Sequence, residues 1–437
     1  MKAVILSAGE GTRLRPFTYT TPKPLLPIVG KPLLSYQLEA LPTIGVTEAC
    51  IVVGYGREQI EAHYRENVPP ISLCFSEQRE QLGTAHALSF ARDFVGDEPF
   101  VMSYGDVLIP HGAWSKFYEA YEEQDAEGLM VLYQIENPAR LGVVETRGKF
   151  IEQITEKPER APPTALINAG IYILPPTIFE AIDATNMSQR REYELTDSLE
   201  ILLHKGSRLT WYELDNWLTI GMPWDLLHAN KVILTEMAQS RGQEEILPLK
   251  LEGDIEDGAT LVGPVGVQKN ARIRAGAYII GPVLIDEGAI IGPNCFIRPY
   301  TYIGKLSRIG NGCEIKNSII MNSTNISHLS YIGDSIIGNN NNLGAGTCVA
   351  NLRFDHASIK VFVNGKLVDS GEKKLGFFMG DNSQTGINVS IMHGRCIGPN
   401  SAVGPGTLLQ EDVPPGTIVF KKEELEKREW ESQNTPQ

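Results

Sequence analysis

The sequence predicts a doubly wound, Rossmann-like α/β domain followed by a parallel β-helix of hexapeptide repeats. Up to about residue 240, short apolar segments alternate with segments of helical period, which is typical of a mostly parallel sheet covered by helices. From Ile255 onwards an aliphatic residue recurs at every sixth position, the pattern of a β-helix. We therefore expect a first domain over residues 1–240 that ends in a linker helix, a β-helix over 250–420 and a polar tail over 421–437.

The size and charge of the chain exclude several classes of protein. Its 437 residues are enough for two or three domains with cores of their own. The 53 Asp and Glu residues outnumber the 39 Lys and Arg residues, and a net charge of −14 would repel a nucleic acid. The cysteines form no CxxC pair, and no apolar run approaches the ~18 residues of a membrane span. We expect a cytoplasmic protein that binds neither nucleic acid nor membrane.

The first domain shows alternating strands and helices from its first residues. We expect strands over 2–6, 49–53, 71–75 and 100–104, and helices over 33–44, 57–65, 85–94 and 223–241. Ligands of such sheets gather at the carboxyl ends of the strands. A Gly-rich segment follows the first of these strands and Gly105-Asp106 follows the last, so both should face one site.

The second half keeps its period of six over many repeats. From Ile255 to Ile315 every sixth residue is aliphatic, and Met321 continues the series. Three such repeats close one triangular coil of about 18 residues. We expect the register to slip by one residue at Ile326 and again at Ile337, and a loop over 351–374 to interrupt the coils before the period resumes.

The Gly-rich segment after the first strand has the chemistry of a phosphate site. Gly9 and Gly11 open the pattern GxGTRxxPxTxxxPK, which also contains Arg13 and Lys23. Glycines let backbone N–H groups approach phosphates, and the two cations supply fixed positive charge. Phosphoryl and nucleotidyl transfer depends on positioning and charge neutralisation rather than on covalent help from the protein.

These motifs resemble those of the sugar-1-phosphate nucleotidylyltransferases. The order of the two halves resembles that of the bifunctional N-acetylglucosamine-1-phosphate uridylyltransferase/glucosamine-1-phosphate acetyltransferases of archaeal type, and the likeness covers nearly the whole chain. The resemblance implies that Arg13 and Lys23 are catalytic and stabilise the phosphates during in-line attack. It also implies Asp106 as the Mg²⁺ ligand. The resemblance also implies that Leu6, Ala8, Gly9, Gln78, Gly83 and Thr84 contact or surround the nucleotide base. It implies that Gly142, Glu156 and Asn168 contact the sugar.

One residue departs from the family pattern. Relatives commonly carry an Asp as a second metal ligand in the motif W-(L/M)-D-(I/T)-G, where this chain has Trp217-Leu-Thr219-Ile-Gly221. A Thr hydroxyl can ligate Mg²⁺, which often uses only one or two carboxylates together with substrate phosphates and water. We therefore keep Thr219 as a metal ligand and expect weaker metal binding or a reduced first activity.

Two cations in the β-helix suggest a second anion site. Arg298 and Lys316 lie 18 residues apart, and each follows the aliphatic residue of its repeat. They should stack on adjacent coils, about 4.8 Å apart. Like charges in this position are unfavourable unless an anion lies between them, although two solvated cations could also splay apart.

The segment Ser327-His328-Leu-Ser-Tyr331 lies near the expected slip in register. A neutral His can take a proton from an attacking amine, but a lone His is often structural. The resemblance implies His328 as the general base of an acetyltransferase and Arg298 and Lys316 as phosphate contacts. It assigns sugar contacts to Tyr331, Asn342 and Asn351.

The loop over 351–374 is rich in basic residues, which suits a phosphate-bearing donor. Lys360 is close to a position where relatives carry a lysine, while Ala357 stands where some have another. The resemblance implies acetyl-CoA as donor, with its pantetheine arm near Gly380 and Asp381. It also implies left-handed coils and a homotrimer whose sites are built between subunits.

The sequence therefore favours a bifunctional enzyme. One half would transfer acetyl from acetyl-CoA to glucosamine-1-phosphate or galactosamine-1-phosphate, and the other would join UTP or dTTP to a sugar 1-phosphate and release pyrophosphate on Mg²⁺. One alternative keeps only nucleotidyl transfer, with the β-helix as an oligomerisation or allosteric platform. Another is a non-catalytic regulatory subunit, which Arg13, Lys23 and Asp106 argue against.

Overall fold

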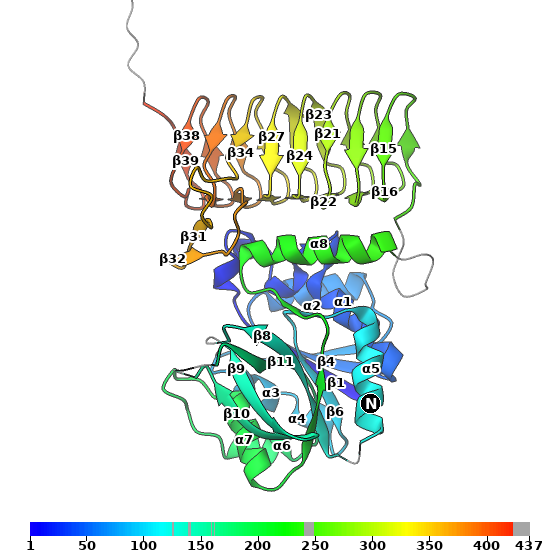
Figure 1. The fold of residues 1–437 in the computed structure, drawn as a ribbon, viewed down its shortest axis with the longest axis vertical. Helices are drawn as coiled ribbons and strands as arrows, with labels where there is room; N and C mark the ends of the chain where they lie inside the picture. Colours follow the sequence, from blue (N-terminus) through cyan, green and yellow to red (C-terminus); the bar gives the residue numbers. More distant parts are fainter. Residues whose placement is uncertain (125, 139–140, 159, 161, 240–248, 423–437) are drawn as a thin grey trace, which may run out of the picture.

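The computed structural model describes residues 1–422 except 125, 139–140, 159, 161 and 240–248. Figure 1 shows an N-terminal α/β domain and, above it, a row of β coils, with the long helix α8 (Pro223–Gln239) running along the coils between them. Of the predicted tail over 421–437, only residues 421 and 422 are among the described residues. The last two residues of the predicted linker helix, 240 and 241, are not among them. Within those residues, no helix combines the length and apolarity needed to cross a membrane.

A mixed sheet forms the centre of the N-terminal domain, in the order β5-β4-β1-β6-β11-β8-β12-β10-β9. The strands β1, β4, β5 and β6 are parallel, as predicted, whereas β11 runs antiparallel to β6. The strand bounds are β1 (Lys2–Ser7), β4 (Glu48–Val53), β5 (Ser72–Glu77), β6 (Phe100–Tyr104), β8 (Gly128–Glu136), β9 (Gly142–Arg147), β10 (Phe150–Glu156), β11 (Thr164–Leu174) and β12 (Leu209–Glu213).

Helices cover both faces of this sheet because its strands are apolar on both sides. In β1, Ala3 and Ile5 belong to one buried cluster and Val4 and Leu6 to another. The first cluster includes residues of α1 (Leu33–Ala40), α2 (Arg57–Glu66) and α5 (His111–Glu122). The second includes residues of α3 (Thr84–Ser89), α4 (Arg92–Val95), α6 (Ile178–Asp183) and α7 (Leu195–His204). The helix predicted over 85–94 is thus two short helices, and that over 33–44 ends as a 3-10 turn, Leu41–Ile44.

Beyond α8 the chain passes in turn through three parallel sheets, which we call the first, second and third faces of the coil domain. The first face contains β14 (Asp254–Ile255), β17 (Arg272–Ile273), β20 (Ile290–Ile291), β23 (Arg308–Asn311), β26 (Asn325–His328), β29 (Asn342–Leu343), β34 (Gln384–Thr385), β37 (Ala402–Val403) and β39 (Ile418–Val419). The second contains β15 (Thr260–Val262), β18 (Tyr278–Ile280), β21 (Phe296–Ile297), β24 (Glu314–Lys316), β27 (Tyr331–Gly333), β30 (Cys348–Val349), β35 (Ser390–Ile391) and β38 (Leu408–Leu409). The third contains β16 (Val265–Val267), β19 (Val283–Ile285), β22 (Thr301–Ile303), β25 (Ile319–Ile320), β28 (Ile336–Ile337), β33 (Phe378–Met379) and β36 (Cys396–Ile397).

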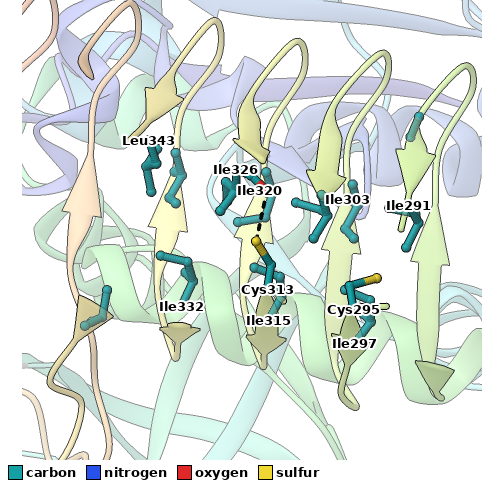
Figure 2. Close-up of a cluster of buried hydrophobic side chains, with 14 of the residues drawn as sticks. Ile291, Cys295, Ile297, Ile303, Cys313, Ile315, Ile320, Ile326, Ile332 and Leu343 are labelled. Atoms are coloured by element: carbon teal, nitrogen blue, oxygen red, sulfur yellow. Dashed lines mark hydrogen bonds between the residues drawn. The ribbon is translucent and has the colours of Figure 1, made fainter. Parts of the chain in front are cut away.

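The aliphatic residue of each repeat points into the coil, where the side chains form stacked rows (Figure 2). Up to Ile315 these residues follow the predicted period. The prediction that Met321 continues the series is wrong, because Ile303 pairs with Ile320 and Met321 packs outside the coil. Residues 319–321 are all apolar, so the period alone could not choose among them.

The first slip in register therefore lies at Ile320 and not at Ile326. Two sides of the coil are one residue short, those over 315–320 and 332–337, and the predicted slip at Ile337 is correct. Both short sides span the corner between the second and third faces. The shortened corner carries Lys316 and Asp334 rather than His328.

The outward residues of the third face are buried against the N-terminal domain. Leu284, Tyr302, Ile319, Ile336 and Phe378 belong to one cluster with residues of α8 and of the segment after the Gly-rich loop. Every one of them is at most 5% exposed. We call this row the third-face ladder.

The loop over 351–374 contains a hairpin, β31 (Lys360–Val363) and β32 (Lys366–Asp369). It extends from the coil domain towards the N-terminal domain (Figure 1). Ile359, Val361 and Val363 on one side of it are buried in the same interdomain cluster. The loop therefore packs on this chain's own first domain.

Candidate active sites

A cavity of about 540 Å³ opens at the carboxyl ends of β1 and β6. The strand order reverses here, since β1 has β4 on one side and β6 on the other, and such switch points are the usual ligand crevices of open α/β sheets. The cavity is lined by every residue predicted for the nucleotide, sugar and metal: Leu6, Ala8, Gly9, Arg13, Lys23, Gln78, Gly83, Thr84, Asp106, Gly142, Glu156, Asn168 and Thr219.

The Gly-rich segment folds into a tight turn that ends in the 3-10 helix Thr12–Leu14. Gly11 has a φ of 68° and accepts a hydrogen bond from the Thr18 hydroxyl to its carbonyl, at 2.8 Å. A Cβ on Gly11 would lie 3.2 Å from side-chain atoms of both Thr18 and Lys23. The glycine therefore permits both the left-handed backbone and the close approach of Lys23.

Two of the residues that line the cavity form an ion pair. Lys23 Nζ forms an ion pair with Asp106 Oδ2, and the Lys23 side chain is only 15% exposed. Thr219 lies beside this pair, because β13 (Leu218–Thr219) pairs with β7 (Val107–Leu108) and sets Thr219 opposite Val107. A carboxylate and a hydroxyl are oxygen donors that fit Mg²⁺ with water and phosphate completing its shell. No cluster of three His, Cys, Asp or Glu ligands occurs in the part of the chain that the structure describes.

The wall beside Gln78 is ordered by amide hydrogen bonds. Gln78 is 4% exposed, and its Nε2 lies 3.0 Å from both the Gly83 carbonyl and His86 Nδ1. Gln81 Nε2 donates to the Ala8 carbonyl at 2.9 Å and so ties this wall to the Gly-rich segment. Sequence reasoning missed Gln81, whose only signal was its place three residues after Gln78.

Acidic residues gather at the other end of the cavity. Arg190 bridges Glu156 and Glu194, with N···O distances of 3.3 and 2.8 Å. Burial raises the pKa of the Glu194 carboxyl, and Glu194 lines the cavity beside Glu156. A Cβ on Gly142 would lie 3.1 Å from Glu156 Oε2, so the absence of a side chain there leaves room at this carboxylate. Glu194 and Arg190 were not predicted, because no motif in the sequence marks them.

The two cations of the coil domain lie on adjacent coils, as predicted, and each is paired with a carboxylate. Arg298 and Lys316 follow the paired residues Ile297 and Ile315 on adjacent coils. Arg298 donates to Glu314 at 2.9 Å, and Lys316 donates to both oxygens of Asp334, at 3.0 and 2.9 Å. Neighbouring coils thus supply a carboxylate to each cation, a pairing that the sequence analysis did not foresee.

A polar cluster surrounds Asp334 at the shortened corner. Asn351 Nδ2 donates to Asp334 Oδ2 and lies 3.1 Å from the Tyr331 hydroxyl. Gly333 lies beneath them: a Cβ there would be 2.6 Å from the Tyr331 hydroxyl and 2.7 Å from Asn351 Nδ2. Burial is the main cause that raises the pKa of Tyr331. The structure thus brings together Lys316, Tyr331 and Asn351, as predicted for one site.

The remaining predicted residues lie away from this cluster, at other corners, on the first face and on the hairpin. His328 ends β26 at the corner between the first and second faces, where it is exposed, and Asn342 is exposed on the first face. Asp381 follows β33 at the corner between the third and first faces, next to Gly380. Its carboxylate accepts hydrogen bonds from the Thr20 hydroxyl at 2.8 Å and from the Asn339 backbone at 2.7 Å. Lys360 is exposed on the hairpin.

The comparisons with known proteins first define a class. A family model described as "Nucleotidyl transferase" matches residues 2–236, and one described as "GMPPB C-terminal domain" matches residues 279–374. The first match covers the whole cavity and the fold around it. The N-terminal domain is therefore a nucleotidyltransferase domain with a Rossmann-like sheet.

Relatives along the full length then define the family. "Bifunctional protein GlmU" of Methanocaldococcus jannaschii is 42% identical over 436 residues, which cover 97% of this chain and 98% of that protein. "Bifunctional sugar-1-phosphate nucleotidylyltransferase/acetyltransferase" of Sulfurisphaera tokodaii is 38% identical over 418 residues, 95% of this chain and 99% of that protein. The chain belongs to the family of bifunctional GlmU-type sugar-1-phosphate nucleotidylyltransferase/acetyltransferases.

Proposed function

We propose that the N-terminal domain transfers a nucleotidyl group from UTP or dTTP to a sugar 1-phosphate. A phosphate oxygen of the sugar attacks the α-phosphorus in line, and the bond to the β-phosphate oxygen breaks, which releases pyrophosphate. The observation that carries this proposal is that one cavity is lined by every residue predicted for the nucleotide, the sugar and the metal. Arg13 and Lys23 neutralise the charge that develops on the phosphates, and Gln78 reads the edge of a pyrimidine.

Asp106 and Thr219 would hold Mg²⁺ in this cavity. A bound Mg²⁺ supplies charge neutralisation between the two phosphate-bearing substrates. Before Mg²⁺ and the substrates bind, the ammonium group of Lys23 neutralises the Asp106 carboxylate. Glu156, Asn168 and the space above Gly142 would take the sugar hydroxyls.

We propose further that the coil domain is a left-handed β-helix that acetylates an amino-sugar 1-phosphate. The sugar amine attacks the thioester carbonyl of acetyl-CoA and gives its proton to His328, the carbon–sulfur bond breaks, and the sulfur takes this proton and leaves as the thiol of CoA. A phosphate would replace Glu314 and Asp334 as partner of Arg298 and Lys316. Tyr331, Asn342 and Asn351 contact the sugar, while Lys360, Gly380 and Asp381 serve the donor.

The spread of these residues over three corners supports a homotrimer. His328 and Asn351 lie at opposite ends of the second face, so one copy alone does not enclose a substrate between them. Large apolar side chains remain exposed on or beside this face. Among them are Leu329, Phe354, Ile387 and Leu408, and Val262 and Tyr278 are exposed on the same face in the early coils. A second copy packed there would cover them and complete the site. The free cysteines support a reducing, cytoplasmic location.

The test is release of CoA thiol in the presence of glucosamine-1-phosphate or galactosamine-1-phosphate, with wild type beside His328→Ala. We expect release with at least one sugar and a loss of about 10²-fold or more in the variant. His204→Ala, an exposed histidine of the first domain, is the matched control. No release with either sugar would favour the alternative of a coil domain that serves only as an oligomerisation or allosteric platform.

A further inference from the structure

The hairpin β31–β32 belongs to the coil domain in sequence but contacts the phosphate-binding turn of the nucleotidyltransferase domain. Its strands join through a two-residue turn, since Val363 pairs with Lys366. Asn364 and Gly365 in this turn have φ values of 49° and 74°, as a tight hairpin turn requires. The turn therefore fixes where the Asn364 side chain points.

The tip of the hairpin is hydrogen-bonded to the Gly-rich segment. Asn364 Nδ2 donates to Thr12 Oγ1 at 3.0 Å, across 352 residues of sequence. Thr12 immediately precedes Arg13, which lines the cavity, and starts the 3-10 turn Thr12–Leu14. Because Thr12 and Arg13 are adjacent, the hydrogen bond from Asn364 restrains the backbone from which the Arg13 side chain extends.

Apolar contacts reinforce the tip. Val361 and Val363, 0% and 8% exposed, lie in one buried cluster with Leu14 and Phe17, which follow Arg13 in the chain. At the base of the loop, Glu372 Oε1 lies 3.0 Å from His228 Nε2 on α8. The hairpin is thus held at its base on α8, along its side by apolar packing and at its tip by Thr12.

We propose that this hairpin is a positioning element of the nucleotidyl-transfer site, with Asn364 as a positioning residue for Arg13. The inference rests on the proposed nucleotidyl transfer and deepens it. Asn364 is exposed and does not line the cavity, so it acts through the Thr12–Leu14 turn and not on substrate. The coil domain then contributes to the first activity without contacting the nucleotide.

The test is a double-mutant cycle of Asn364→Gly and Thr12→Val. Gly keeps the positive φ of the turn and removes only the side chain. We expect Asn364→Gly to lower kcat/KM for pyrophosphate release about fivefold, the size of one net hydrogen bond, and to leave acetyl transfer unchanged. The double variant should be no worse than Thr12→Val alone. Asn270→Gly, the same change at an exposed positive-φ turn of an early coil, is the matched control and should change neither activity.

Hydrogen exchange gives a readout that does not need activity. In the free full-length protein, the Leu14 amide donates to the Gly11 carbonyl at 2.9 Å, and we expect it to exchange faster in Asn364→Gly than in wild type or Asn270→Gly. Val361→Thr, which weakens the apolar contact at constant shape, should act in the same direction. Unchanged exchange at Leu14 in both hairpin variants overturns the inference. Wild-type protein without pyrophosphate release would overturn the proposed function instead, while the exchange result would still decide the role of the hairpin.

Discussion

Lys23→Met removes the ammonium group from the cavity floor and keeps most of the side-chain volume. In the free protein Lys23 neutralises Asp106, and in the reaction it would lie beside the phosphates. The Lys23 and Asp106 side chains are 15% and 28% exposed, so little water screens the interaction. Loss of one such group from a preorganised site costs about 2.7–4 kcal/mol of transition-state stabilisation, about 10²–10³ in rate.

The assay is pyrophosphate release with UTP or dTTP and a sugar 1-phosphate at saturating Mg²⁺. We expect kcat and kcat/KM to fall together, since the lost interaction strengthens as charge develops on the leaving pyrophosphate. Lys31→Met is the matched control: Lys31 is paired with Glu39 at the surface and lies outside the cavity. A loss below about threefold for Lys23→Met, or an equal loss for Lys31→Met, would refute the reasoning.

Three further predictions concern other parts of the molecule. Gly333→Ala places a methyl 2.6 Å from the Tyr331 hydroxyl, so acetyl transfer should fall at least about tenfold while pyrophosphate release is unchanged. Acetyl transfer as fast as in wild type would contradict a role of the polar cluster at that corner. Phe378→Ala empties a buried position of the third-face ladder, so chemical denaturation should show a free energy of unfolding lower by about 3–5 kcal/mol. A decrease of less than about 1 kcal/mol would contradict this packing. Burial raises the pKa of Glu194, so the contribution of this carboxyl to stability should fall as pH rises from 4.5 through the raised pKa. The melting temperature of Glu194→Gln relative to wild type should therefore be higher at pH 7 than near pH 4. A difference between the two proteins that is the same at both pH values would exclude this effect.

The residues that line the cavity of the N-terminal domain could largely be predicted, because many of them follow strands in a fixed order. The Gly-rich segment, Gln78 and Asp106 each come after a parallel strand, and carboxyl ends of parallel strands meet at one edge. Glu194 could not be predicted in this way. It precedes α7 and reaches the cavity through tertiary packing that no local pattern encodes.

The coil domain shows what a period can and cannot predict. The period of six identified the inward rows, but it could not choose Ile320 over Met321, and it placed the first slip too late. The acidic partners of Arg298 and Lys316 depend on which coil neighbours which. The packing of the 351–374 loop on its own first domain lies beyond any repeat analysis.

The third-face ladder did leave a signal in the sequence. On most third-face repeats the residue before the inward aliphatic one is itself large and apolar, as at Leu284, Tyr302, Ile336 and Phe378, whereas most first-face repeats carry a polar residue in that position, such as Arg272, Arg308 or Asn342. Such a stripe on one side of a coil predicts a covered face. It does not predict what covers it, which here is α8 and the neighbouring domain.

The same ladder makes the chain difficult to divide into its two halves. A fragment that began after α8 would present a continuous apolar strip of the third face to water, and strips of this kind cause aggregation. The N-terminal half alone would lose the partner of Leu14, Phe17 and Trp224 in the same way. We therefore expect limited proteolysis between the halves to leave two pieces that stay associated, and separately expressed halves to be recovered in soluble form only when they are produced together.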